Sequence, residues 1–195
     1  MRLVLGLGNP GSRYAHTRHN VAWRVLDVLA SRGGAAPAAA FERYRARRVR
    51  IGDEDVELLE PLTFMNLSGE ALVEWEQRYG LAADTLLVVT DDVYLPIGML
   101  RLRTGGSSGG HRGLESIEAA IGHREYARLR IGVGAAESGD GLREHVLEEF
   151  APEELPALEA AIRLAADAVE SWVSAGILSA MNQFNRKVRR EESES

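Results

Sequence analysis

Three polar residues of this chain, His19, Asn9 and Asp91, have the types and local settings needed to activate water. His19 stands beside Asn20, just ahead of an amphipathic stretch. Asn9 lies in a glycine turn after the first apolar run, and Asp91 follows another short apolar run. An imidazole, whose ordinary pKa is about 6.5, can take a proton from water, while a carboxylate on its second nitrogen stabilises the cation. Asparagine NH2 groups can donate to the oxygen of a tetrahedral intermediate. This set indicates hydrolysis of an activated ester, without a cofactor or a metal ion.

Each candidate also has a structural interpretation. A lone histidine is more often structural, and Asn66, in the segment 63–69, is by itself better explained as a cap or turn residue. His19 is the stronger case because a strand end, a glycine turn and a helix start converge on it. In α/β sheets the ligand crevice lies beyond the carboxyl ends of the strands. We therefore expect Asn9 and Asp91 to meet His19 there.

The elements that position these residues alternate between strand and helix patterns. Residues 3–7 and 86–90 are short, continuously apolar runs, which predict strands buried on both faces. Apolar residues at helical spacing from Val21 predict a helix that stops at Gly33. The remaining predicted elements are a hairpin (44–51 with 56–59), a strand (99–103), a short helix (114–121), a strand (127–133) and a long helix from Pro152 to Gly176. This order predicts an α/β domain with a mixed sheet.

The glycine turn at residues 6–11 matches the dinucleotide-binding pattern G-x-G-x-x-G. That fingerprint needs a helix at its third glycine and an acidic residue about 20 positions further on. Here Pro10 sits inside the turn, the predicted helix waits until about Asn20, and residues 33–40 contain no acid. The context therefore disfavours a nicotinamide-binding enzyme, for which a cofactor would raise the melting temperature.

A second glycine motif, residues 106–110, matches the G-x-S-x-G nucleophile elbow of α/β-hydrolases. An elbow is a tight turn between a strand and a helix, whereas Ser108 lies in a longer loop of glycine and serine. The order Ser108, Asp140, His145 fits the chain order of a hydrolase triad, so a serine nucleophile remains an alternative that a serine-directed phosphonate can test.

Composition indicates an ordinary single-domain globular protein. The chain has 195 residues, a net charge of -6 and no cysteine, which excludes disulfides, thiolate metal sites and a cysteine nucleophile. The N-terminal residues do not form a secretory signal, and no segment approaches the roughly 20 apolar residues of a membrane span. We expect a cytoplasmic protein without a membrane partner.

Nearly all the cations are arginine, and they are concentrated in separate stretches. Five lie within residues 43–50. Four more share strand faces in pairs, because they alternate along two predicted strands: Arg101, Arg103, Arg128 and Arg130. The planar guanidinium suits phosphate, so these stretches could form one phosphate-facing surface. Solvated strand faces are an equally good explanation.

Several motifs occur together in a characteristic order. They are Gly6-Leu7-Gly8-Asn9-Pro10-Gly11, Tyr14, Thr17-Arg18-His19-Asn20, Phe64-Met65-Asn66-Leu67-Ser68-Gly69, Asp91-Asp92, Gly109-Gly110-His111, Arg128-Leu129-Arg130-Ile131-Gly132 and Met181-Asn182. Over nearly its whole length the chain resembles bacterial-type peptidyl-tRNA hydrolase, which cleaves the ester joining a stalled peptide to its tRNA.

The resemblance implies one α/β domain over residues 1–195, with a twisted, mostly parallel mixed sheet surrounded by helices and a flexible charged tail from about residue 186. It implies His19 as general base, Asp91 holding it in its basic form, and Asn9 distinguishing an N-blocked peptidyl group. It further implies peptidyl-tRNA as partner, no DNA, no covalent intermediate and a monomer.

The family's binding positions are implied for two further groups. The expected substrate-binding residues are Tyr14, Phe64, Asn66, His111 and Arg112. The expected tRNA phosphate-binding residues are Arg101, Arg103, Arg128 and Arg130, and such contacts would make affinity salt-dependent rather than sequence-specific.

Arg112 is the main departure, since the family usually carries asparagine there. Arginine cannot accept a hydrogen bond, although it can contact phosphate. The retained His19 and Asp91 favour an esterase. Arg112 slightly favours the alternative, a non-catalytic RNA-binding module like the relatives of this family that act as group II intron splicing factors.

Overall fold

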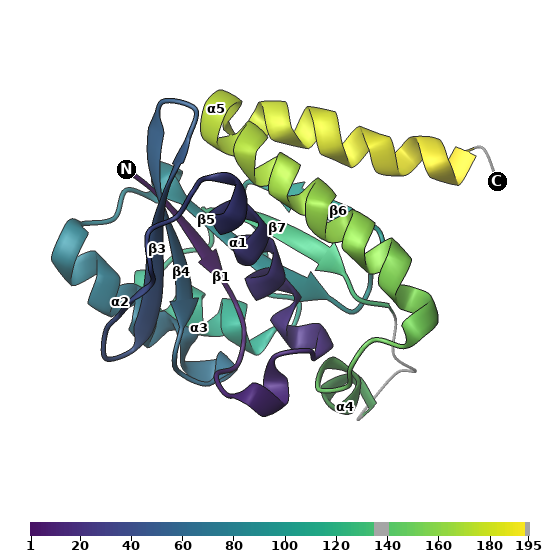
Figure 1. Cartoon of the computed structure of the whole chain (residues 1–195), viewed down its shortest axis with the longest axis horizontal. Coiled ribbons are helices and arrows are strands. Elements are labelled where there is room, and N and C mark those ends of the chain that lie inside the picture. The colour runs from purple at the N-terminus through teal and green to yellow at the C-terminus, as the bar shows by residue number, and fades with distance from the viewer. Residues whose placement is uncertain (135–140, 194–195) are drawn as a thin grey trace.

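A mixed sheet forms the centre of the molecule (Figure 1). The structure is a computed structural model that describes residues 1–134 and 141–193. Within these residues the strand order is β2-β3-β4-β1-β5-β7-β6. The central strands β4, β1, β5 and β7 run parallel, and the pairs at both edges are antiparallel. The strands are β1 (Arg2–Gly6), β2 (Ala39–Ala40), β3 (Tyr44–Ile51), β4 (Glu54–Pro61), β5 (Leu86–Asp92), β6 (Leu100–Arg103) and β7 (Ala127–Gly132).

Helices cover both faces of this sheet (Figure 1). Side chains of β1 alternate between two apolar layers. Val4 packs among residues of α1 and α5, whereas Leu3 and Leu5 pack among residues of α2 and α3. The continuous apolar run of β1 therefore contributes to both cores, as a strand covered on two sides must. The helices are α1 (Val21–Arg32), α2 (Ser68–Tyr79), α3 (Arg112–Ile121), α4 (Gly141–Val146) and α5 (Leu155–Ser193).

The predicted α/β class and mixed sheet are confirmed. The apolar runs predicted as strands are β1 and β5, and the predicted hairpin is the β3–β4 pair, which is antiparallel from Tyr44 opposite Pro61 to Ile51 opposite Glu54. α3 ends where predicted, because Gly122 adopts the left-handed conformation (φ 77°) that favours glycine.

Three helices differ from the sequence-based prediction, and one of them, the short helix α4, has no predicted counterpart. The pattern predicts that the last helix ends at Gly176. Gly176 (φ 81°, ψ 170°) does interrupt α5, but the helix resumes beyond this kink and continues to Ser193, so that its two parts run in different directions (Figure 1). α2 also has no predicted counterpart, because the apolar part of its buried face consists only of Ala71, Leu72 and Trp75.

Two predictions concern residues that the structure does not describe or describes only in part. Asp140 lies outside the described residues. The flexible tail expected from about residue 186 stays a prediction, although the backbone of α5 extends to Ser193. Among the described residues, no helix is both long enough and apolar enough to span a membrane.

The carboxyl ends of the parallel strands converge on one edge of the sheet. β1 and β5 are hydrogen-bonded neighbours, with Gly6 opposite Val89. The turn that contains Asn9 therefore leaves the sheet close to Asp91, near the end of β5. The chain then returns through the 3-10 turn Arg18–Asn20, which leads directly into α1 and carries His19 to the same edge.

Candidate active site

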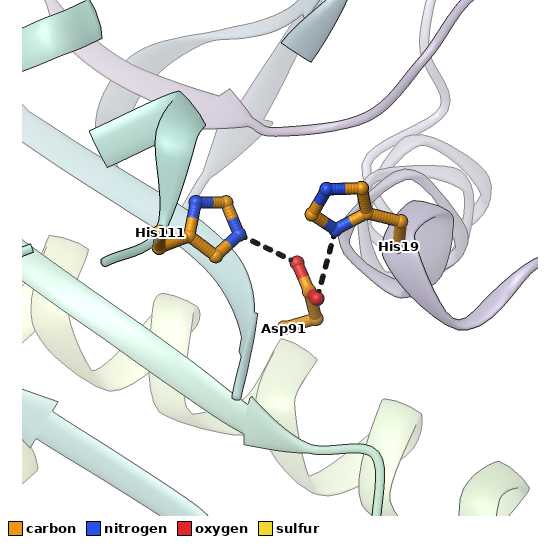
Figure 2. A group of neighbouring side chains, drawn as sticks. All are labelled: His19, Asp91 and His111. Atoms are coloured by element: carbon orange, nitrogen blue, oxygen red, sulfur yellow. Dashed lines mark hydrogen bonds and ion pairs between the residues drawn. The ribbon is translucent and has the colours of Figure 1, made fainter. Parts of the chain in front are cut away.

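Asp91 lies between two histidine side chains (Figure 2). Its Oδ2 is 2.8 Å from Nδ1 of His19, and its Oδ1 is 2.8 Å from Nε2 of His111. The three residues come from distant parts of the chain: the turn before α1, the end of β5 and the cap of α3. The fold thus brings together a carboxylate and two imidazoles at the predicted edge of the sheet.

The hydrogen-bond partners determine which nitrogens carry protons. His111 caps α3, and its Nδ1 accepts from the backbone N–H groups of Gly113 (3.1 Å) and Leu114 (3.4 Å). Its proton must therefore be on Nε2, which donates to Asp91. The Asp91 carboxylate likewise requires a proton on Nδ1 of His19. We infer from these partners that Nε2 of His19 keeps its lone pair and is the basic atom of the site.

Asp91 is almost completely buried, with 1% of its side chain exposed. Burial alone would raise the pKa of this carboxyl, but the charges and hydrogen bonds of His19 and His111 outweigh it and hold the pKa well below its usual range. The Oγ1 of Thr90 also lies 2.8 Å from Nε2 of His111. Asp91 is therefore a fixed anion at neutral pH.

The same three residues could be considered as metal ligands, since their donor atoms lie within 4.8 Å of one another. However, Nδ1 of His111 already accepts from two backbone N–H groups. A metal ion on Nε2 would then require a doubly deprotonated imidazole. The donor set fits a hydrogen-bonded carboxylate better than a metal site.

Asn9 is held in one orientation by three hydrogen bonds. Its backbone N–H donates to Oδ1 of Asn20 (2.9 Å), and its carbonyl accepts from Nδ2 of Asn20 (2.9 Å). Its side-chain Oδ1 accepts from the N–H of Met65 (2.8 Å). This last bond fixes which way the carboxamide points. Its NH2 group donates to no group of the described residues and is therefore available to a ligand.

His19 opens into a cleft of about 300 Å³, at the lower end of the usual range for small-molecule sites. Both polar and apolar side chains form its wall. The cleft is lined by His19, Asp91, Asp92, Val93, Tyr94, Ser108, Gly109, Gly110, His111, Arg112, Leu114, Arg130, Leu142, Arg143 and Val146. Of the expected substrate-binding residues, His111 and Arg112 belong to this cleft.

Three other expected substrate-binding residues do not line the cleft. Phe64 is 54% exposed, Asn66 is also exposed, and Tyr14 is partly exposed and hydrogen-bonded to Arg13. Asn66 and Phe64 are nevertheless close in sequence to Met65, which binds Asn9. Their expected contact with substrate stays a prediction.

The four expected phosphate-binding arginines share one face of the sheet. Arg101 lies opposite Arg130, and Arg103 opposite Arg128, across the β6–β7 pair. Arg101 and Arg103 are exposed. Arg130 is partly exposed and donates to the carbonyl of Ser107 (2.9 Å).

Arg128 is buried, which the alternation along β7 does not predict. Its side chain is 1% exposed, it lies 3.5 Å from Glu118 of α3, and it donates to the carbonyls of Ser107 and Arg124. Its guanidinium also lies over the ring of Tyr126. α3 covers this part of the sheet face, so Arg128 supports the loop before α3 and does not present a free guanidinium.

The two glycine motifs do not form the sites that their patterns alone would predict. α1 begins only at Val21, well after Gly11, so no helix opens at the third glycine. Ser108 lines the cleft, but Nε2 of His145 lies 3.0 Å from the carbonyl of Gly134. Among the described residues, His145 is therefore directed to the backbone and is not paired with Ser108.

Two residues that hold the turn carrying His19, Arg18 and Asn20, are not predicted from the sequence to have this role. Arg18, 6% exposed, donates to the carbonyl of Val133 (2.8 Å) and to Glu154 (2.7 Å). It ties the turn that carries His19 to the end of β7 and the start of α5. The fully buried Asn20 orients Asn9. Both residues are direct neighbours of His19 in the sequence, and this position was the only sequence signal that could have indicated their role.

An α/β domain with a paired histidine and a directed carboxamide at the carboxyl edge of its parallel strands has the organisation of a hydrolase. Residues 3–193 match the family model for peptidyl-tRNA hydrolase. The chain belongs to this family, as its motifs predict.

Similarity to individual members extends over nearly the whole chain. The chain is 45% identical over 186 residues to a peptidyl-tRNA hydrolase of Symbiobacterium thermophilum, covering 94% of this chain and 98% of the relative. It is 42% identical to that of Desulforamulus reducens, covering 96% and 90%. The crystal structure of peptidyl-tRNA hydrolase from Acinetobacter baumannii superposes with a TM-score of 0.89 at 36% identity, covering 95% of this chain and 94% of that one.

Proposed function

We propose that this protein hydrolyses the ester between peptide and tRNA in peptidyl-tRNA, and that His19 activates the attacking water without a covalent intermediate. The observation that carries the proposal is the His19–Asp91 hydrogen bond of 2.8 Å, which leaves Nε2 of the histidine as a base at the cleft. Membership of the peptidyl-tRNA hydrolase family supports the choice of substrate.

The chemistry follows from the proton positions. Nε2 of His19 takes a proton from water as the water oxygen attacks the ester carbonyl. The carbonyl oxygen becomes an oxyanion, to which the free NH2 of Asn9 donates. The intermediate then collapses, the bond to the terminal ribose oxygen breaks, and His19 returns its proton to that oxygen. The products are a tRNA hydroxyl and a peptide carboxylic acid, which loses its remaining proton to solvent and becomes a carboxylate.

Asp91 and His111 have different roles in this scheme. Asp91 fixes the tautomer of His19 and stabilises its positive charge during the reaction. His111 accepts at its Nδ1 from the backbone of α3, and its Nε2 donates a second hydrogen bond to Asp91. That bond makes the carboxylate a weaker base. The proton taken from water therefore stays on His19 and does not pass to Asp91.

Exposed arginines provide the tRNA-binding surface in this proposal. Arg101 and Arg103, with the partly exposed Arg130, form a cationic face beside the cleft. They would contact phosphates and position the ester near His19. Tyr14, Phe64 and Asn66 would line the path of the peptidyl or terminal-nucleotide end.

The test is release of N-acetyl-amino acid from N-acetyl-aminoacyl-tRNA under single-turnover conditions. Release is expected, with slower release from aminoacyl-tRNA that has a free amino group. RNA binding without release would contradict the proposal and support the RNA-binding module. Inactivation by a serine-directed phosphonate, with Ser108 labelled, would contradict a mechanism without a covalent intermediate.

A further inference from the structure

Two arginines in the active-site cleft have no partner among the described residues. Arg112 begins α3, Arg143 lies in α4, and both line the cleft into which His19 opens. The exposed guanidiniums make no hydrogen bond or ion pair with any residue that the structure describes. The third arginine of the cleft, Arg130, is different, because it is bonded to Asp92 and to the carbonyl of Ser107.

The carboxylates that line the cleft are already bound elsewhere. Asp91 accepts from His19 and His111. Asp92 accepts from Arg130 and from the backbone N–H of Tyr94 (2.8 Å). Among the residues that the structure describes, Arg112 and Arg143 therefore have no counter-ion within the cleft, and an anionic ligand would supply one.

The side chains around Arg112 and Arg143 favour the binding of an anion that is attached to an apolar or aromatic group. Leu142 and Val146 of α4 and Val93 after β5 line the cleft together with the two arginines. Apolar walls reduce the screening of charge by water, so that the attraction between a guanidinium and an anion is larger there than on an open surface. The exposed ring of Tyr94, also in this cleft, offers a face on which a nucleobase could stack.

We propose that Arg112 and Arg143 form a subsite for the phosphodiester on the 5′ side of the terminal tRNA nucleotide. This inference rests on the proposed function, since it assumes that the ester lies at His19. The phosphodiester is the anionic group of the substrate closest to that ester. It is present in every peptidyl-tRNA, whereas a carboxylate on the peptide is present in only some. The arginine fork matches phosphate oxygens.

The test uses minimal substrates that lack all other tRNA phosphates. N-acetyl-leucyl esters of the dinucleotide CpA are prepared with the natural phosphodiester and with an uncharged methylphosphonate. For the wild-type protein we expect kcat/KM to be about tenfold lower for the uncharged ester, mainly through KM, because the contact exists in both ground and transition states. In the double variant Arg112→Gln, Arg143→Gln the two esters should be hydrolysed equally.

A matched variant controls for loss of charge alone. Arg163→Gln removes an exposed arginine of α5, which does not line the cleft. It should retain the wild-type preference for the charged ester, and the melting temperature of each variant checks its fold. The single variants Arg112→Gln and Arg143→Gln should each lose part of the preference.

Two results would contradict the proposal of a phosphodiester subsite. In the first, the double variant keeps the full wild-type preference for the charged linkage. In the second, it loses instead a wild-type preference for N-acetyl-glutamyl over N-acetyl-glutaminyl esters, which would assign the arginines to a peptide carboxylate. Failure of the proposed function is a different result: the wild-type protein would release no N-acetyl-amino acid from either dinucleotide ester or from N-acetyl-aminoacyl-tRNA.

Discussion

Replacing Asp91 by asparagine removes one charge and leaves the shape of the site nearly unchanged. The carboxylate accepts from both His19 and His111. A carboxamide has one oxygen and one NH2 group, so only one of the two imidazole N–H groups can keep an acceptor. The substitution therefore affects both the tautomer of His19 and the stabilisation of its positive charge.

The size of the effect follows from the geometry. With Nδ1 and Oδ2 at 2.8 Å, the charge centres of an imidazolium and the carboxylate lie about 4 Å apart, which at an effective dielectric constant of about 20 gives about 4 kcal/mol. If this stabilisation is lost in the transition state, the rate falls about a thousandfold. We expect a decrease of that order in the single-turnover rate constant.

The assay is rapid-quench release of N-acetyl-amino acid at saturating enzyme, which separates the chemical step from binding. Asp92→Asn is the matched control, because Asp92 lies next to Asp91 on β5 and binds Arg130 instead of an imidazole. The control should change KM more than the rate constant. An Asp91→Asn protein that is folded and reacts within about tenfold of the wild-type rate would refute the role of the carboxylate.

The same variant has a stability signature with a defined sign. The pKa of Asp91 is lowered from its ordinary value of 3.8, so the carboxylate stabilises the folded state above that pH and loses this contribution as the pH falls below it. The difference in free energy of unfolding between wild type and Asp91→Asn should therefore decrease on acidification from pH 7 to pH 3. A constant difference across this range would contradict the assignment.

Three further outcomes are expected. Asn20→Ala should lower the single-turnover rate about tenfold or more without abolishing tRNA binding, because Asn9 loses two hydrogen bonds that hold it; an unchanged rate would contradict this positioning. Gly132→Ala should prevent stable folding, since its Cβ would lie 1.9 Å from a carbonyl oxygen, whereas Gly141→Ala meets nothing within 4 Å and should leave the urea midpoint nearly unchanged. Burial raises the pKa of Tyr126 to about 12, so its stabilising contribution should be present below about pH 10 and be lost as the pH rises to 12; a native-state absorbance titration that shows every tyrosine ionising near pH 10 would refute this.

The sheet and the central pair of the site could be predicted because local patterns determine them. The apolar runs of β1 and β5 have no polar face, which requires cover on both sides, and parallel neighbours bring their carboxyl ends together. This is enough to expect Asn9 and Asp91 near His19. The ends of α1 and α3 could also be predicted from a local pattern, because in each case a glycine directly follows the helical spacing of apolar residues.

The remaining features depend on contacts between distant segments. The alternation along β7 predicts that Arg128 and Arg130 share a face, but only the packing of α3 determines that Arg128 is buried against Glu118. The role of His111 depends on its capping of α3, which fixes its proton on the side of Asp91. α2 was missed because its contacts with α3 compensate for a short apolar face, and the sequence of α2 alone does not contain them.

The central claim is that His19 is the base of an ester hydrolysis, and His19→Ala tests it most directly. Its matched control is His123→Ala, which removes an exposed histidine after α3, away from the cleft. In single-turnover release from N-acetyl-aminoacyl-tRNA, His19→Ala should react about a thousandfold more slowly than wild type while still binding tRNA, and His123→Ala should react at the wild-type rate. Equal rates for wild type and His19→Ala would contradict the account.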